Sequence, residues 1–144
     1  MEPHLTDISH VIQLAVAPVF LLTAIATLIN ALNMRLGRIV DRGRVVRERL
    51  HAGASGAAEA ADPEISDLQR RSRLVYHAIF CCVLSALLVC LVVAGAFLGA
   101  LLGVDLARTV ATFFIGAMLV MIAGLSLFLR EVYLAVRTGA HNQR

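Results

Sequence analysis

The stretch Asn33-Met34-Arg35-Leu36-Gly37-Arg38-Ile39-Val40-Asp41-Arg42-Gly43-Arg44 joins an apolar segment directly to an arginine-rich one. The apolar segment extends from about Ile8 to Met34. At about 1.5 Å per residue this is long enough for a helix to cross a hydrocarbon core of about 30 Å. Because no proline stands at the junction, we expect one helix that leaves a membrane near Arg35 and continues beyond it.

The composition of the whole chain supports a membrane protein. The chain has 144 residues, of which 59% are hydrophobic and 16% charged, far from the usage of ordinary soluble domains. We expect a single membrane domain over residues 1–144, all α-helical, with spans at about 8–34, 78–102 and 106–129. The short segment Gly103-Val104-Asp105 would form the turn between the second and third spans.

Apolar residues continue at alternating spacings of three and four beyond the first span, which is the pattern of a helix seam. A second such seam precedes the second span, after the helix-start signal Asp62-Pro63-Glu64. We therefore predict an antiparallel cytoplasmic helical hairpin at about 35–77, with a flexible turn at 51–61. The two predicted seams are Ile29, Leu32, Leu36, Ile39, Gly43, Val46 and Leu50, and Ile65, Leu68, Ser72, Val75, Ile79 and Cys82.

The distribution of arginine predicts the orientation in the membrane. Nine of the thirteen arginines lie between the first and second spans and three follow the third, whereas only Arg108 lies in or near the turn between spans two and three. Cytoplasmic loops of membrane proteins are enriched in Lys and Arg. We expect an N terminus outside and a C terminus in the cytoplasm.

The first span carries polar side chains at helical spacing, at Gln13, Thr23, Thr27 and Asn30. Exposure of such groups to lipid is unfavourable, so this face is expected to be covered. It would line a pore if several copies surrounded an axis, because hydroxyl and amide groups can replace part of an ion's hydration shell. Alternatively, these residues hydrogen-bond between helices inside one bundle.

Arginines recur on the predicted hairpin, and two interpretations stay open. The first is a basic vestibule that attracts anions or anionic lipid headgroups. The second is the positive-inside distribution alone, with Asp41 and Asp67 holding the hairpin by ion pairs, for example Asp41 with Arg70 or Arg73. The candidate basic residues are Arg35, Arg38, Arg42, Arg49, Arg70 and Arg73.

Several glycines are candidates for close helix packing. Gly37 and Gly43 are poor helix formers, and close approach of another helix would compensate for them. Gly95, Gly99 and Gly103 form a GxxxGxxxG row, the pattern that lets helices approach backbone to backbone. We favour packing of spans two and three within one chain, with an oligomer contact as the alternative.

No pattern indicates catalysis. There is no phosphate loop, no HExxH, no paired intramembrane carboxylates and no nucleophile with its base. His77 and Cys81 share a helix face, but two ligands do not make a metal site. Cys81, Cys82 and Cys90 lie in one apolar run without zinc spacing. We therefore expect a protein that is not an enzyme, with no cofactor, no metal and no nucleic-acid partner.

The exit motif from Asn33 to Arg44, together with Pro18 in the first span, resembles a family of small bacterial membrane proteins catalogued as domain of unknown function 2721. The resemblance covers roughly residues 9–136. It implies the three-span bacterial architecture and brings no established activity. The positions that carry the motif are Asn33, Arg35, Arg38, Asp41, Arg42 and Arg44.

Two functional hypotheses follow. The first is a homo-oligomeric inner-membrane protein, a candidate ion channel with a basic cytoplasmic vestibule. The alternative is a non-catalytic accessory or assembly subunit of a larger membrane complex, whose glycine row would face its partner. Binding of anionic lipid headgroups is compatible with both.

Overall fold

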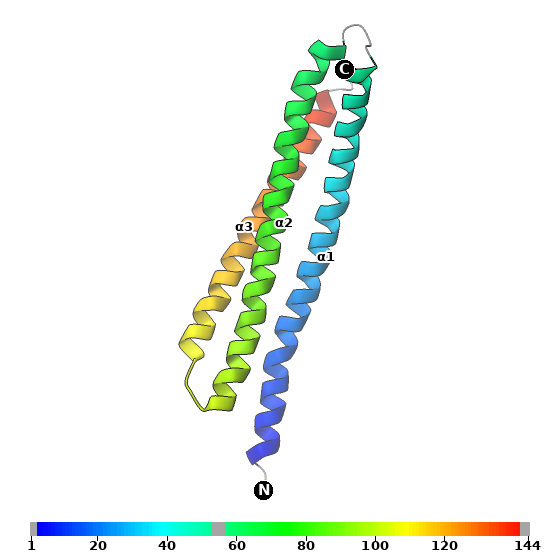
Figure 1. The fold of residues 1–144 in the computed structure, drawn as a ribbon. Helices are drawn as coiled ribbons and strands as arrows, with labels where there is room; N and C mark the ends of the chain where they lie inside the picture. The colour runs from blue at the N-terminus through cyan, green and yellow to red at the C-terminus, as the bar shows by residue number, and fades with distance from the viewer. Residues whose placement is uncertain (1–2, 53–56, 142–144) are drawn as a thin grey trace. The chain divides into compact units, whose positions relative to one another are not determined.

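Three long helices make up the described part of the chain (Figure 1). The computed structural model describes the backbone of residues 3–52 and 57–141, and the side chains of residues 16–52 and 63–136. The helices are α1 (Pro3–His51), α2 (Ala57–Leu102) and α3 (Ala107–His141). Each is long and apolar enough to cross a membrane. The chain is a multi-pass α-helical membrane protein, so the predicted all-α class with three spans is confirmed, whereas the cytoplasmic hairpin stays a prediction.

Helix boundaries agree with the sequence in two places and differ in two. α1 runs on past Met34, and α2 ends at Leu102 before the short turn. In contrast, α2 begins at Ala57, so the predicted start at Asp62 is wrong and Pro63 lies inside the helix. The alanines at 57, 58, 60 and 61 explain the difference, because alanine has the highest helix propensity. α3 also extends to His141, well beyond the predicted end of its span.

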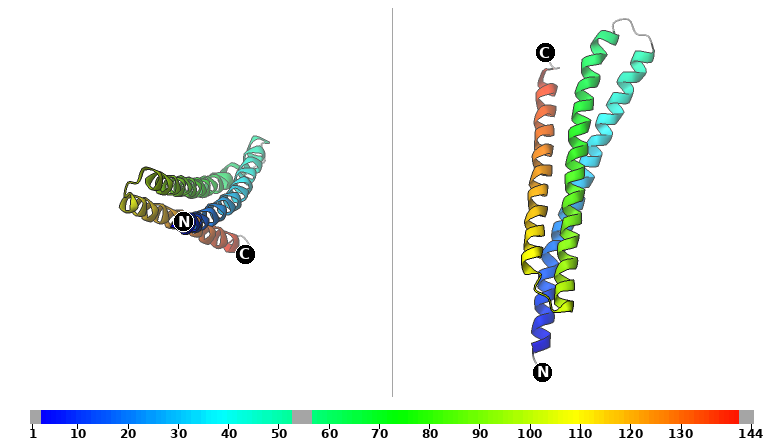
Figure 2. Two further views of the ribbon diagram at one scale, coloured as in Figure 1. Left: turned by 90° about the horizontal axis from the view of Figure 1, so that it is seen from below. Right: turned by 60° about the vertical axis from the view of Figure 1, so that its left-hand side comes forward.

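Contacts divide the chain into two units. The second comprises Asn30–Cys81 and Ala123–Arg144. In it, the parts of α1 and α2 next to their connection lie side by side (Figure 2). Every second seam position, at steps of seven residues, is buried there: Leu32, Ile39 and Val46 on α1, and Leu68 and Val75 on α2, where Ala78 beside the seam is also buried. The predicted seams are therefore the faces on which these helix segments pack, whereas the position of this unit outside a membrane stays a prediction.

The first unit comprises Met1–Ile29 and Cys82–Ile122. Its buried Ser85 donates a hydrogen bond to the carbonyl of Ala117, 2.9 Å away, and so joins α2 to α3. Added Cβ atoms at Gly95 and Gly99 would meet Val110 at 3.5 Å and the Val104 carbonyl at 3.2 Å. These two glycines therefore face α3 and its preceding turn, as expected for packing within one chain.

The other three candidate packing glycines behave differently. A Cβ added at Gly37, Gly43 or Gly103 would meet nothing within 4 Å. The predicted close approach of another helix to Gly37 and Gly43 is therefore not found within the described part of the chain. Gly103 instead has a φ of 63° and follows the end of α2, a conformation that glycine adopts without strain. The helix-packing role of the GxxxGxxxG row is thus limited to Gly95 and Gly99.

Candidate functional site

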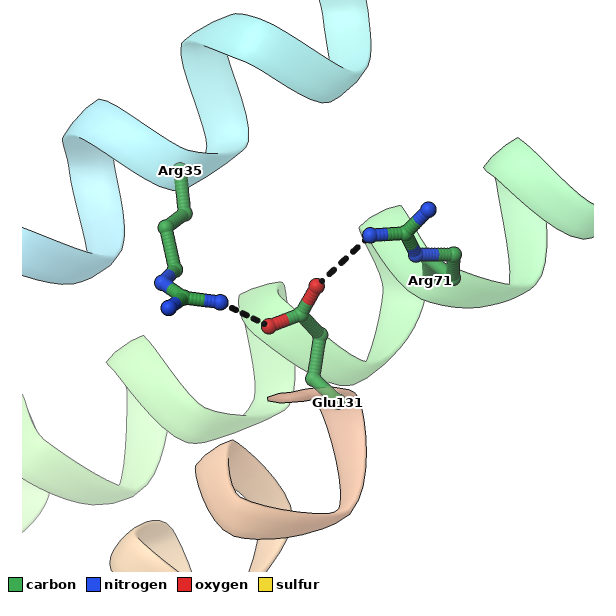
Figure 3. A network of polar contacts seen from close by, with 3 residues as sticks. All are labelled: Arg35, Arg71 and Glu131. Atoms are coloured by element: carbon green, nitrogen blue, oxygen red, sulfur yellow. Dashed lines mark hydrogen bonds and ion pairs between the residues drawn. The ribbon is translucent and has the colours of Figure 1, made fainter. Parts of the chain in front are cut away.

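A buried carboxylate lies at the centre of the second unit. Glu131 of α3 is only 1% exposed. Its Oε2 accepts a hydrogen bond from Arg35 of α1 and its Oε1 accepts one from Arg71 of α2, each at 3.1 Å (Figure 3). One carboxylate therefore joins all three helices. Charge-assisted bonds of this kind are stronger than neutral ones, and both oxygens of Glu131 are satisfied.

The three members of this ionic cluster stand at helical steps from buried residues. Arg35 stands three residues after Leu32, and Arg71 stands three residues after Leu68. On α3, Glu131 follows the buried Ala117 and Gly124 at steps of seven. Residues at these spacings share one helix face, so each charged side chain points along the same direction as its buried neighbours.

The cluster carries more positive than negative charge, because two guanidinium groups surround one carboxylate. Arg71 is 18% exposed and Arg35 is 38% exposed. The Nε of Arg71 is buried and has no hydrogen-bond partner among the described residues. The guanidinium of Arg35 also lies over the ring of Phe128, with Cζ 5.2 Å from its centroid, a cation–π contact. Arg35 is thus held inside the helix packing and is not a free member of the predicted basic vestibule.

The other predicted basic residues are exposed. Arg42 forms an ion pair with Glu64, 2.9 Å away, which connects α1 with α2. Arg38, Arg49, Arg70 and Arg73 make no ion pair with any residue that the structure describes. Their exposure is compatible with a basic surface that meets anions or lipid headgroups.

The predicted ion pairs of the two aspartates are absent from the described residues. The acidic partners of the arginines are Glu48, Glu64 and Glu131, and neither Asp41 nor Asp67 takes part. Asp41 lies two positions beyond the buried Ile39, about 200° around the helix, and therefore points away from α2. The pairing of Asp41 with Arg70 or Arg73 is therefore wrong.

An open groove of about 780 Å³ lies between α1 and α2 in the second unit. Apolar residues of both helices line it, including Ile39, Ile65 and Leu68. Arg44, Arg47 and Arg73 line it as well. Of these, only Arg44 forms an ion pair with a described residue, Glu48 at 3.2 Å. The groove thus combines an apolar lining with cationic side chains.

The predicted polar face of α1 is exposed. Thr23, Thr27 and Asn30 all lie on the surface of the chain, whereas the side chain of Gln13 falls outside the described residues. Thr23 donates its hydroxyl to the Val19 carbonyl, and Thr27 donates to the Thr23 carbonyl. The described contacts give Asn30 no hydrogen bond. For Thr23, Thr27 and Asn30, hydrogen bonding between helices of one chain, one of the two alternatives, is therefore not found among the described residues.

Sequence reasoning missed two of the three residues of the ionic cluster. Neither Arg71 nor Glu131 is among the site residues that the sequence predicts, although the neighbours Arg70 and Arg73 are. A usable signal exists for both. Arg71 keeps the step of three from Leu68 and the step of four to Val75, and Glu131 keeps the step of seven from Gly124.

Comparisons with known proteins give one match. The model of a family described as a protein of unknown function, DUF2721, matches residues 15–140. No curated protein and no solved structure matches the chain.

Proposed function

We propose that this protein, which belongs to the DUF2721 family of proteins of unknown function, is an ion channel. Several copies would assemble around one axis to form it. The Thr23, Thr27 and Asn30 faces of α1 would surround that axis. The exposed arginines would form a basic vestibule at its cytoplasmic mouth. The protein has no catalytic role in this proposal.

The observation that carries the proposal is the exposed amide of Asn30. Asn30 lies in the apolar run of α1, and the described residues provide no partner for it. An exposed polar side chain is unfavourable in hydrocarbon and usually faces another helix or a water-filled cavity. Thr23 and Thr27 lie on the same face and already donate to carbonyls of their own helix, which leaves their oxygen lone pairs available. Such oxygens can contact a passing ion.

Location and lipid contacts belong to the same proposal. The proposed location is a bacterial inner membrane, and the excess of arginine between the first two spans supports an orientation with the N terminus outside and the C terminus in the cytoplasm. Anionic lipid headgroups are the proposed partners of Arg73 and of the other arginines that line the groove between α1 and α2. The groove between α1 and α2 supports this, because an amphipathic lipid can use both its apolar lining and its arginines.

The decisive experiment counts subunits and then measures flux. Native mass spectrometry of the protein alone in nanodiscs is expected to show a closed ring of four or more copies. Reconstituted liposomes should then conduct ions, and Asn30→Leu or Thr27→Leu should reduce the flux without loss of assembly. Thr112→Leu is a matched control, because Thr112 is also exposed and also donates to its own helix. A monomer or dimer, or unchanged flux in the Asn30 and Thr27 variants, would contradict the proposal.

A second candidate is an accessory or assembly subunit of a larger membrane complex. It is favoured by the same unpartnered Asn30, which a helix of another protein would cover equally well. It loses one of its supports, because Gly95 and Gly99 face α3 of the same chain and not a partner. Copurification with another membrane protein at a fixed ratio, with no self-assembly, would favour this candidate.

A further inference from the structure

The outer face of α1 beyond Asn30 has an unusual combination of residues. Gly37, Arg38 and Asp41 are all exposed, and so are the apolar side chains of Met34 and Val45. With about 100° per residue, these five lie in a sector centred about 200° from the buried Ile39, on the side of α1 that faces away from α2. Asn30 lies in the same sector. The face that the proposed function turns to the axis therefore continues along the helix.

The charges on this outer face are unused within the chain. Arg38 and Asp41 are three positions apart, yet they form no ion pair with each other or with any other described residue. Their directions differ by about 60° around the helix. Arg38 therefore lies toward one flank of the outer face, while Asp41 lies near its middle.

Gly37 lies on the opposite flank and leaves open space. A Cβ at this position would meet nothing within 4 Å, and a helical glycine is less favourable than alanine by about 1 kcal/mol. Exposed Met34 and Val45 provide apolar surface beside it. A notch at glycine next to protruding apolar side chains is a surface on which a second helix can pack closely.

We propose that the outer face of α1, from Met34 to Val45, packs against α1 of a second copy, with Arg38 of one copy paired to Asp41 of the next. This inference rests on the proposed function, because it names the contact between neighbouring copies of the ring. Copies with the same orientation in a membrane present these residues at the same depth, and Arg38 and Asp41 differ by only about 4.5 Å along the helix axis. The two flanks differ, so the contact is heterologous, the type that generates a ring when the rotation between neighbouring copies closes.

Charge reversal tests the contact. Asp41→Arg and Arg38→Asp should each raise the protein concentration needed for half assembly roughly tenfold or more, as expected when a close pair of opposite charges becomes a pair of like charges. The double variant D41R/R38D restores opposite charges between neighbours and should recover most of the assembly. Assembly is measured by native mass spectrometry in phosphatidylcholine nanodiscs, and melting of the detergent-dispersed monomer checks that each variant folds.

The chain provides a matched control pair. Asp67 and Arg70 on α2 are also three positions apart and also lack ion pairs with described residues. Asp67→Arg and Arg70→Asp should leave assembly unchanged. Equal effects of the control pair, or failure of the double variant to recover, would overturn the inference.

Three further results separate the inference from its alternatives. A ring that ignores all four reversals would overturn the contact but leave the proposed function standing. A wild-type protein that stays monomeric would overturn both. An effect of Arg38→Asp that appears only when the nanodiscs contain phosphatidylglycerol would assign Arg38 to lipid headgroups and overturn the pairing with Asp41.

Discussion

At the scale of single residues, Glu131 is the position on which the packing of the second unit depends most. Its carboxylate is buried and receives one hydrogen bond from α1 and one from α2. Glu131→Gln keeps the shape but removes the charge, and so leaves Arg71 without a counter-charge. We expect the free energy of unfolding to fall by about 3 kcal/mol, in line with broken buried pairs. Chemical unfolding in detergent measures the loss.

The control for this variant is Glu48→Gln. Glu48 forms an exposed pair with Arg44 at a spacing of four, and such pairs contribute about 0.3–0.5 kcal/mol. Within the cluster, Arg71→Gln should destabilise more than Arg35→Gln, because Arg71 is 18% exposed and Arg35 is 38% exposed. Equal losses for Glu131→Gln and Glu48→Gln would contradict the structural importance of the cluster.

At the scale of helices, Gly43 and Gly99 have different surroundings, so the same substitution to alanine should have opposite effects on stability. Alanine at Gly43 meets nothing within 4 Å, so its better helix propensity should stabilise the protein by up to about 1 kcal/mol. Alanine at Gly99 would place its Cβ 3.2 Å from the Val104 carbonyl, whose residue is held by a hydrogen bond to Gly99 itself. We expect Gly99→Ala to destabilise by about 1 kcal/mol.

Thermal unfolding of the two variants in the same detergent is the measurement. The comparison is internal, because both substitutions add one methyl group to a helical glycine. If Gly99→Ala stabilised the protein as much as Gly43→Ala, the close approach of α2 to the turn before α3 would not exist in solution.

At the scale of the whole molecule, the orientation in the membrane is open to direct labelling. In a variant with Cys81, Cys82 and Cys90 replaced by alanine, single cysteines at Ser66 and Val104 should react with a membrane-impermeant maleimide from opposite sides. Ser66 lies between the first two spans and Val104 in the turn after the second, and both are exposed. The arginine distribution predicts that Ser66→Cys reacts only after the cells are opened. Labelling of Ser66→Cys in intact cells would contradict the predicted orientation and indicate the opposite one.

Much of the fold could be predicted from periodicity within each segment. The apolar runs located the spans, and the steps of three and four located the buried faces of α1 and α2, since a helix presents residues at those steps on one side. The start of α2 was missed because a proline near a helix start signals a boundary only on average. The polar face of Thr23, Thr27 and Asn30 was also recognisable in advance, though not its exposure.

The sequence by itself determined three apolar helices, the seam on α1 and α2, and the position of the arginines along the chain, because all of these depend on spacing inside one segment. Only the tertiary structure decided which charges meet. Glu131 is 96 residues from Arg35 and 60 from Arg71, and their contact depends on the rotation and register of three helices. Asp41 lies in the arginine-rich stretch itself yet points away from α2, because two residues turn a helix by about 200°. Which charged side chains pair depends on how the helices are oriented relative to one another, and spacing within one segment does not determine that orientation.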